Sequence, residues 1–273
     1  MTKMTIAVHG ATGSQGEPVA SRLAAAGHDV RPVTRAAGAD LLDRASLEAA
    51  YAGAHAVVLQ LPLIYDARAL TMGDNAARAA EAAGVQHLLL NTGGPFGHEP
   101  TGVPYIDARH RAASADVPRV TMLQPTTYLE NLSAPWSAPG IVDRGVLAYP
   151  RRAEFAGQWV ATDDVALAVV RALEERIVGR FDLPGETLDG NQLAAALAAA
   201  LERPVRYEEI APREFGDRLR PHLGEHAAAG TAAVYELFAE QPPALSPASS
   251  FPGWAPRDVQ AWARSAFPVT ASV

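Results

Sequence analysis

The stretch "TIAVHGATGSQGEPVASRLAAAGHDVRPVTR", residues 5–35, decides the fold of this chain. An apolar run at residues 4–10 leads into a glycine-rich turn, then a helix-like run at 16–27 and a second apolar run at 28–35. Short apolar runs bounded by glycine are typical of buried parallel strands, and the helix-like run carries its apolar residues on one face. The order strand, helix, strand predicts a parallel βαβ unit with a right-handed crossover.

Three glycines, Gly10, Gly13 and Gly16, lie between the first strand and the helix. A side chain at this turn would hold a pyrophosphate away from the helix N-terminus, where free N–H groups and the helix dipole favour anions. Glycine also adopts positive φ at little cost. The motif in this place predicts a dinucleotide site; the alternative is a tight turn that binds nothing. Further donors to the phosphates are expected from Thr12, Ser14 and Gln15.

The end of the second strand indicates which nucleotide is bound. A carboxylate there would bind the ribose hydroxyls of NAD and repel a 2′-phosphate, but the strand ends in Thr34 and Arg35. A guanidinium binds phosphate through two parallel hydrogen bonds. We therefore expect NADP(H) rather than NAD(H), with Arg35 at the 2′-phosphate and Thr34 adding a hydroxyl. The alternative is a solvent-exposed arginine that binds no ligand.

Strands and helices continue to alternate downstream. Strands are predicted at 38–43, 55–63, 85–94, 119–125 and 204–211, and helices at 66–83, 161–175, 191–202 and 226–240, with shorter ones headed by Ser46, Pro212 and Pro256. The pattern is regular up to Pro125 and looser beyond it. It predicts an α/β fold with a Rossmann doubly wound parallel sheet over residues 1–130. Residues 131–273 are expected to return to that core and to form a smaller C-terminal α/β substrate lobe, within a single structural unit.

The composition narrows the classes of function. The 273 residues are 48% hydrophobic and 19% charged, which is typical of a globular chain with an ample core. The net charge of −7 argues against nucleic acid as a partner. An early first strand and the lack of a long apolar run predict a cytoplasmic protein without a signal peptide or a membrane span. The lack of cysteine excludes disulfides and thiolate catalysis, and no histidine and carboxylate spacing suggests a metal site. We expect a small-molecule substrate and a monomer or homodimer.

The segments "GATGSQG", "VTR", "AGAHAVVLQLP", "LQPTTYLENL", "WVATDDVALAV" and "PGWAPRDVQAWA" resemble, in that order, landmarks of the NmrA-like branch of the atypical short-chain dehydrogenase/reductases. The likeness covers nearly the whole chain and implies a Rossmann fold, an NAD(P) cofactor and two lobes. The branch contains quinone, carbonyl and dye reductases and also redox-sensing regulators, so the resemblance alone does not imply catalysis. The chain departs from the family after Arg35, where a short segment lacks a second basic contact to the 2′-phosphate.

The wider dehydrogenase family uses a serine or threonine, a tyrosine, and a lysine four residues after the tyrosine. Lys3 is the only lysine in this chain, so that complete set is excluded. Thr92 follows a strand, and Tyr105 and Arg109 have the tyrosine–lysine spacing on a short predicted helix. Arginine supplies the positive charge and ribose contacts but cannot relay a proton. The alternative is that Tyr105 only packs at the helix start and Arg109 is solvated.

Other residues are candidates for the proton donor or the cofactor pocket. Histidine titrates near neutrality, and Tyr128 in "PTTYLEN" follows a strand near the expected nicotinamide position. Ligands of α/β folds bind at the carboxyl ends of strands. The candidate donors besides Tyr105 are His87, His98, His110 and Tyr128, and the strand ends are expected to add Leu61, Pro62, Asn91, Thr92 and Pro125 to the cofactor site.

Three functions are compatible with these patterns. The first is an NAD(P)H-dependent oxidoreductase that reduces a small carbonyl, quinone or enone by direct hydride transfer. The second is a non-catalytic NADP(H)-binding redox sensor. The third is a non-redox tailoring enzyme, a cyclase or dehydratase, on the same fold.

Overall fold

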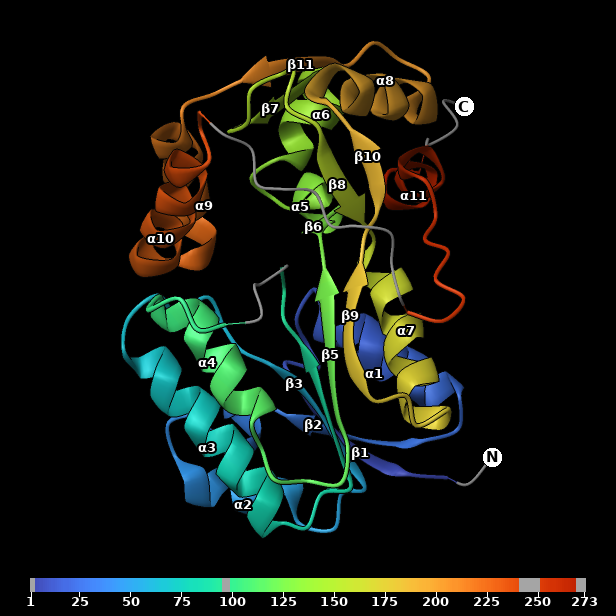
Figure 1. Cartoon of the computed structure of the whole chain (residues 1–273). Coiled ribbons are helices and arrows are strands. Elements are labelled where there is room, and N and C mark those ends of the chain that lie inside the picture. Colours follow the sequence, from blue (N-terminus) through green and yellow to red (C-terminus); the bar gives the residue numbers. More distant parts are fainter. Residues whose placement is uncertain (1–2, 95–98, 241–250, 269–273) are drawn as a thin grey trace. The chain divides into compact units, whose positions relative to one another are not determined.

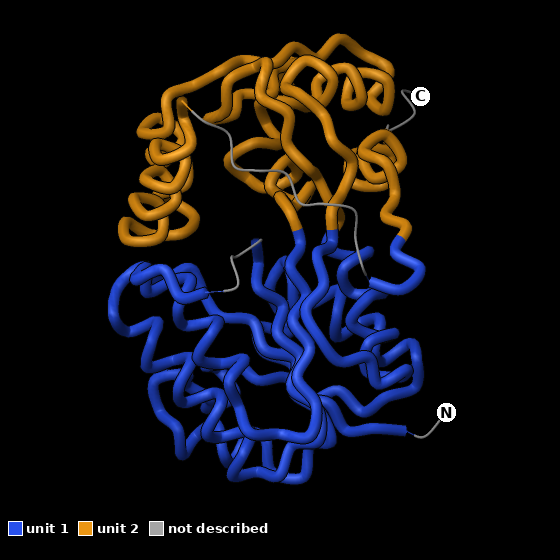
Figure 2. Tube along the Cα trace, in the orientation of Figure 1, with its two compact units in different colours: residues 1–125, 162–183, 248–254 blue, residues 126–161, 184–247, 255–273 orange. Residues whose placement is uncertain are grey.

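A computed structural model describes residues 3–94, 99–240 and 251–268. The chain divides into two compact units, which Figure 2 distinguishes by colour. Unit 1 comprises residues 1–125, 162–183 and 248–254, and unit 2 comprises 126–161, 184–247 and 255–273. Unit 1 is therefore discontinuous in sequence: the chain leaves it after Pro125 and adds a helix and a strand to it later.

Unit 1 is built on a six-stranded parallel sheet with the strand order β2-β1-β3-β4-β5-β9 (Figure 1). Every neighbouring pair in this sheet is parallel. This arrangement confirms the predicted Rossmann-like sheet. The strands are β1 (Thr5–His9), β2 (Asp29–Val33), β3 (Ala56–Gln60), β4 (His87–Asn91), β5 (Val120–Pro125) and β9 (Gly179–Leu183).

Helices cover both faces of this sheet, as a doubly wound fold requires (Figure 1). One face carries α1 (Gly16–Ala25) and α7 (Thr162–Glu174), and the other carries α2 (Arg44–Tyr51), α3 (Arg68–Ala82) and α4 (Pro104–Ala113). Alanine-rich sequences let α3 and α4 approach closely: a Cβ on Gly73 of α3 would lie 2.2 Å from the carbonyl oxygen of Ala108 in α4. This packing fixes α4, which carries two of the candidate catalytic residues.

The predicted strand at residues 38–43 is wrong. These residues form turns between a short 3-10 helix, η1 (Arg35–Ala37), and α2. The Asp40 carboxylate accepts the Leu42 N–H at 2.9 Å, and the Asp43 carboxylate accepts the Ala45 N–H at 3.0 Å and caps α2. The Asp40 side chain thus satisfies a backbone group that a strand would pair with a neighbour, and Asp43 already begins the next helix, so the segment is a loop.

Unit 2 has two small sheets, one of order β10-β8-β6 and one that pairs β11 with β7. Its core combines aliphatic residues with several aromatic ones, among them Tyr149, Trp159, Phe215 and Trp262. Its strands are β6 (Thr127–Tyr128), β7 (Val146–Tyr149), β8 (Gly157–Val160), β10 (Glu186–Leu188) and β11 (Arg206–Glu209). Its helices are α5 (Glu130–Ser133), α6 (Ala138–Arg144), α8 (Gly190–Leu201), α9 (Pro212–Leu223), α10 (Glu225–Leu237) and α11 (Val259–Ala266).

Across residues 3–94, 99–240 and 251–268, no helix is both long and apolar enough to cross a membrane.

Candidate functional site

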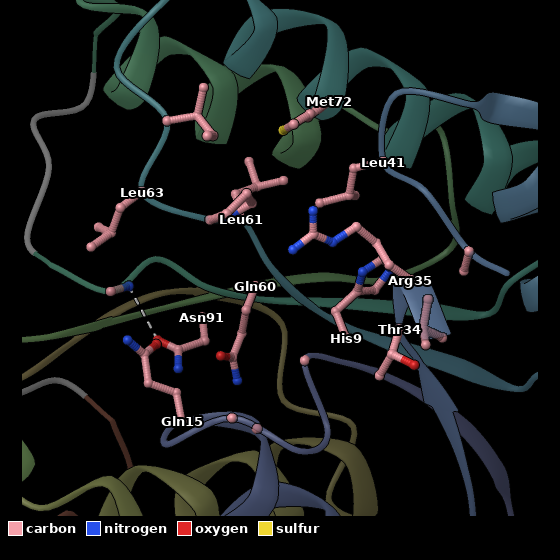
Figure 3. Close-up of a pocket in the computed structure, with 18 of the residues that line it drawn as sticks. His9, Gln15, Thr34, Arg35, Leu41, Gln60, Leu61, Leu63, Met72 and Asn91 are labelled. Carbon is pink, nitrogen blue, oxygen red and sulfur yellow. Dashed lines mark hydrogen bonds between the residues drawn. The ribbon is translucent and has the colours of Figure 1, made fainter. Parts of the chain in front are cut away.

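Unit 1 contains a pocket of about 630 Å³ at one edge of its sheet (Figure 3). The last residues of four neighbouring strands line it: His9 of β1, Val33 of β2, Gln60 of β3 and Asn91 of β4. Parallel sheets bind ligands outside the carboxyl ends of their strands, so the pocket lies where the fold is expected to hold one.

The structure brings nearly all of the predicted cofactor residues to this one pocket. Pro125, the last residue of β5, is the exception, since it is not among the residues that line the pocket. The lining residues that the sequence did not predict include His9, Asp40, Leu41, Gln60, Arg68 and Met72. The predicted residues that line the pocket are Gly10, Thr12, Gly13, Ser14, Gln15, Gly16, Thr34, Arg35, Leu61, Pro62, Asn91 and Thr92.

The glycines of the loop let the loop backbone lie close to the N-terminus of α1. Gly10 has φ of +60° and donates its N–H to the Val33 carbonyl at 3.1 Å, which ties the loop to β2. A Cβ on Gly16 would lie 2.1 Å from the Gly10 carbonyl oxygen, so only glycine allows α1 to begin this near the loop. The N-cap residue Gln15 makes no capping hydrogen bond through its side chain. The start of α1 is therefore suited to an anion.

Three arginines, Arg35, Arg68 and Arg109, line the pocket, and they differ in their partners. Arg68 binds the Asp66 carboxylate through three hydrogen bonds of 2.8–3.1 Å. Arg35, by contrast, has no ion pair or side-chain hydrogen bond with any residue that the structure describes. Thr34, next to it, accepts the Ala37 N–H at its hydroxyl. Arg35 is thus the cation of this pocket that can bind an anionic ligand without breaking an existing pair.

Arg109 is buried, with 2% of its surface exposed, and is not the solvated side chain of the alternative interpretation. Its guanidinium donates to the carbonyl oxygens of Leu61 at 3.2 Å, Thr92 at 2.8 Å and Tyr105 at 2.5 Å. It also lies over the Tyr105 ring, with Cζ 3.7 Å from the ring centroid, and the Tyr65 ring stacks on Tyr105 at 5.1 Å. Arg109 therefore joins the loops after β3 and β4 to the first turn of α4 and holds Tyr105 at the pocket.

Thr92 does not present its hydroxyl as a catalytic group. The residue is fully buried, and Oγ1 lies 2.6 Å from the Gly94 carbonyl oxygen and 3.0 Å from that of Leu123. A hydroxyl has one hydrogen, which is directed at one of these backbone acceptors. The predicted catalytic role of Thr92 therefore lacks geometric support, and the residue stabilises the end of β4 instead.

Replacing Arg109 with methionine is expected to lower the free energy of unfolding by about 2–3 kcal/mol, because three buried carbonyl groups lose a charged donor. Thermal and urea unfolding would measure the loss. Arg111→Met, on the same helix, is the control: Arg111 pairs with Asp74 at the surface, where an ion pair contributes about 0–1 kcal/mol. Equal losses in the two variants would contradict the bridging role of Arg109.

The remaining candidate proton donors differ in position. Burial and the nearby charge of Arg119 lower the pKa of His87 to about 4, and its Nε2 lies 2.8 Å from Thr121 Oγ1, so His87 is a neutral core residue. His110 lies on α4 but does not line the pocket, and His98 lies outside the described residues. Tyr128 is buried in β6 of unit 2, and its place in a substrate pocket stays a prediction. Within the described ranges, no group of three or more histidine or acidic side chains is arranged to hold a metal ion.

Comparisons with known proteins agree with this geometry. The model of the NmrA-like family matches residues 2–250. The chain is 30% identical over 220 residues to NAD(P)H azoreductase of Xenophilus azovorans, which covers 79% of this chain and 74% of that protein. It is also 32% identical over 228 residues to (4-alkanoyl-5-oxo-2,5-dihydrofuran-3-yl)methyl phosphate reductase of Streptomyces griseus. This match covers 75% of this chain and 77% of that protein.

The fold is also similar to a solved structure with a bound nucleotide. The crystal structure of Citrobacter sp. triphenylmethane reductase complexed with NADP(H) aligns with a TM-score of 0.72 over 96% of this chain and 99% of that one. At 20% identity this likeness shows the fold alone. Since the family model spans most of the chain, this protein belongs to the NmrA-like family of atypical short-chain dehydrogenase/reductases, with an NAD(P)-binding Rossmann fold.

Proposed function

We propose that this protein is an NADPH-dependent reductase of a small carbonyl, quinone or enone substrate. The observation that carries the proposal is one pocket in unit 1 that combines the glycine loop, the ring of Tyr105 and the guanidinium of Arg35, which has no side-chain partner among the described residues. The two relatives whose names denote reductases support the reaction class.

The residues of the pocket fit a dinucleotide. The loop leaves no room for a Cβ at Gly16, so the start of α1 lies directly against the loop backbone. This close approach is what the binding of a pyrophosphate requires. The side-chain nitrogen of Gln60 is buried at the pocket without a partner among the described residues, which suits a site completed by a ligand. Gln15 and Asn91 lie at one end of the close-up view, and Thr34 and Arg35 lie at the other (Figure 3). We assign the Arg35 end to the 2′-phosphate and the Asn91 end to the nicotinamide.

The chain's own residues would then position the substrate and supply a proton. When bound, NADPH supplies a hydride to the substrate and is oxidised to NADP⁺. The Tyr105 hydroxyl would donate the proton that the reduced substrate oxygen requires. Arg109 cannot act as the proton source, because its guanidinium stays protonated. Its part is to fix Tyr105 through the bond to the Tyr105 carbonyl and the contact with the ring.

Replacing Arg35 with alanine is expected to weaken NADPH binding about 10- to 150-fold and to leave NADH binding nearly unchanged, since a lost charge-assisted hydrogen bond costs about 1.5–3 kcal/mol. Calorimetric titration with both nucleotides would measure the change. Arg68→Ala is the matched control: Arg68 lines the same pocket but is already bound to Asp66, so less than about a threefold effect is expected. If NADH and NADPH weaken equally in Arg35→Ala, this arginine does not select the 2′-phosphate.

A direct test of the function is NADPH oxidation by the wild-type protein with a panel of quinones, aldehydes, ketones, enones and an azo dye. Steady oxidation with at least one acceptor class is the expected result. Tight nucleotide binding without turnover of any acceptor would overturn the reductase proposal in favour of a redox sensor. Conversion of a substrate without oxidation of NADPH would overturn it in favour of a non-redox tailoring enzyme.

A further inference from the structure

A histidine occupies the last position of β1, directly before the glycine loop. His9 is buried, with 4% of its surface exposed, and it lines the nucleotide pocket. Its side chain lies on the same side of the pocket as Thr34 and Arg35 (Figure 3). The group therefore faces the part of the site that the proposed function assigns to the 2′-phosphate.

The ring of His9 is held by a tyrosine that does not line the pocket. His9 Nε2 lies 2.5 Å from the hydroxyl of Tyr51, and the rings meet edge to face with centroids 5.6 Å apart. Tyr51 belongs to α2 and is fully buried. Each polar hydrogen of a buried pair such as this is expected to be donated in a hydrogen bond, because an unsatisfied buried donor costs free energy.

The position of the shared proton follows from the donors available. The Tyr51 hydroxyl has no other hydrogen-bond acceptor among the described residues, so its hydrogen is satisfied only by donation to His9 Nε2. Burial lowers the pKa of His9 to about 3, so the ring is neutral at physiological pH. A neutral imidazole that accepts at Nε2 carries its hydrogen at Nδ1. One polar hydrogen of His9 then remains for a ligand.

We propose that His9 donates its Nδ1 hydrogen to the 2′-phosphate of NADP(H), and that Tyr51 is a positioning residue that selects this tautomer. The inference rests on the proposed nucleotide site and adds a residue to it. A phosphate oxygen accepts a stronger hydrogen bond than the ribose hydroxyl of NAD(H), because the acceptor is charged. Because His9 is buried, a neutral donor there also avoids the cost of burying a positive charge. His9 thus adds to the preference for the phosphorylated nucleotide.

Three variants separate this role from simple packing. His9→Asn keeps an amide near the position of Nδ1, whereas His9→Gln keeps one near Nε2, where it can still meet Tyr51. Tyr51→Phe keeps the aromatic ring and removes only the hydroxyl that fixes the tautomer. Thermal unfolding of each variant checks that the fold is retained.

Calorimetric titration with NADPH and NADH is the main measurement. His9→Gln is expected to bind NADPH about 10-fold more weakly, with NADH changed by less than about threefold, while His9→Asn stays within about threefold of the wild type for both. Wild-type NADPH affinity in His9→Gln, equal weakening in His9→Asn and His9→Gln, or equal losses for the two nucleotides would each overturn the inference. If the wild type binds neither nucleotide, the proposed function fails first.

Nitrogen NMR of the histidine rings gives a second readout. The Nδ1–H tautomer of His9 is expected in the wild type and a shift toward the Nε2–H tautomer in Tyr51→Phe, together with about a threefold loss of NADPH affinity. An Nε2–H tautomer in the wild type would overturn the inference even if the affinities changed as expected.

Discussion

Replacing Gly13 with valine is expected to abolish nucleotide binding while leaving the fold intact. Gly13 donates its N–H to the Gly10 carbonyl at 2.8 Å and accepts the Glu17 N–H at 2.9 Å, so it sits in the turn that opens α1. A branched side chain there would occupy the space in which a pyrophosphate approaches the loop. Calorimetry with NADPH and NADH should show a loss of at least about 1,000-fold, which corresponds to about 4 kcal/mol.

Two comparisons make the Gly13 result specific. Ser14→Ala removes one hydroxyl from the same loop without adding bulk, and less than about a 10-fold loss is expected because a neutral hydrogen bond contributes about 0.5–1.5 kcal/mol. A Cβ at Gly13 would meet only the Gly10 carbonyl oxygen, at 3.3 Å, which a small backbone shift relieves, so circular dichroism and the unfolding temperature should stay near the wild-type values. Wild-type affinity in Gly13→Val would show that the pyrophosphate does not bind at this turn.

Turnover is expected to fall about 10²- to 10⁴-fold in Tyr105→Phe, the range that a positioned general acid contributes. The change removes only the phenolic hydroxyl and keeps the ring that Arg109 and Tyr65 contact, so the local packing is preserved. Steady-state rates with the best acceptor of the panel, together with the NADPH dissociation constant, would measure the effect. A lower kcat at unchanged nucleotide affinity is the signature of lost proton donation.

Tyr65→Phe provides the control, because it removes a hydroxyl from the stacked neighbour, which does not line the pocket. Its turnover should stay within about threefold of the wild type, since a general acid contributes far more than that. If Tyr105→Phe also stays within that range, Tyr105 is not the proton donor. A quinone acceptor would agree with such a result, because its reduced oxygen can take a proton from water.

The first half of the fold was predictable because its signals are local. The glycines at 10, 13 and 16 follow an apolar strand, and the alternation of apolar runs and alanine-rich helices continues to β5. Residues 38–43 form a loop rather than the predicted strand because Asp40 binds the Leu42 N–H, which a strand would have paired, and Asp43 caps α2. In unit 2, β7, β8 and β10 have only three or four residues, too few for a periodic pattern, and their pairing is decided by tertiary contacts.

Site residues that belong to a local sequence motif were predictable. Site residues that only the folded chain brings to the pocket were not. Arg68 and Met72 reach the pocket from α3, and no local signal connects them to the glycine loop. His9 did leave a signal, a polar residue at the end of an apolar strand directly before the first glycine. The sequence shows the spacing of Tyr105 and Arg109, but spacing alone cannot show that the arginine is buried and donates to three backbone carbonyl groups.

The strand β9 comes much later in the sequence than its partner β5, which has a consequence for synthesis of the protein. β5 pairs along one side with β9, whose residues 179–183 are synthesised only after the whole of residues 126–178. A nascent chain that has just completed β5 therefore exposes an unpaired, apolar sheet edge on the ribosome, the kind of edge that recruits strands of other chains. Maturation of the nucleotide-binding unit must wait for β9, so chaperone protection of that edge during translation would raise the yield of active protein.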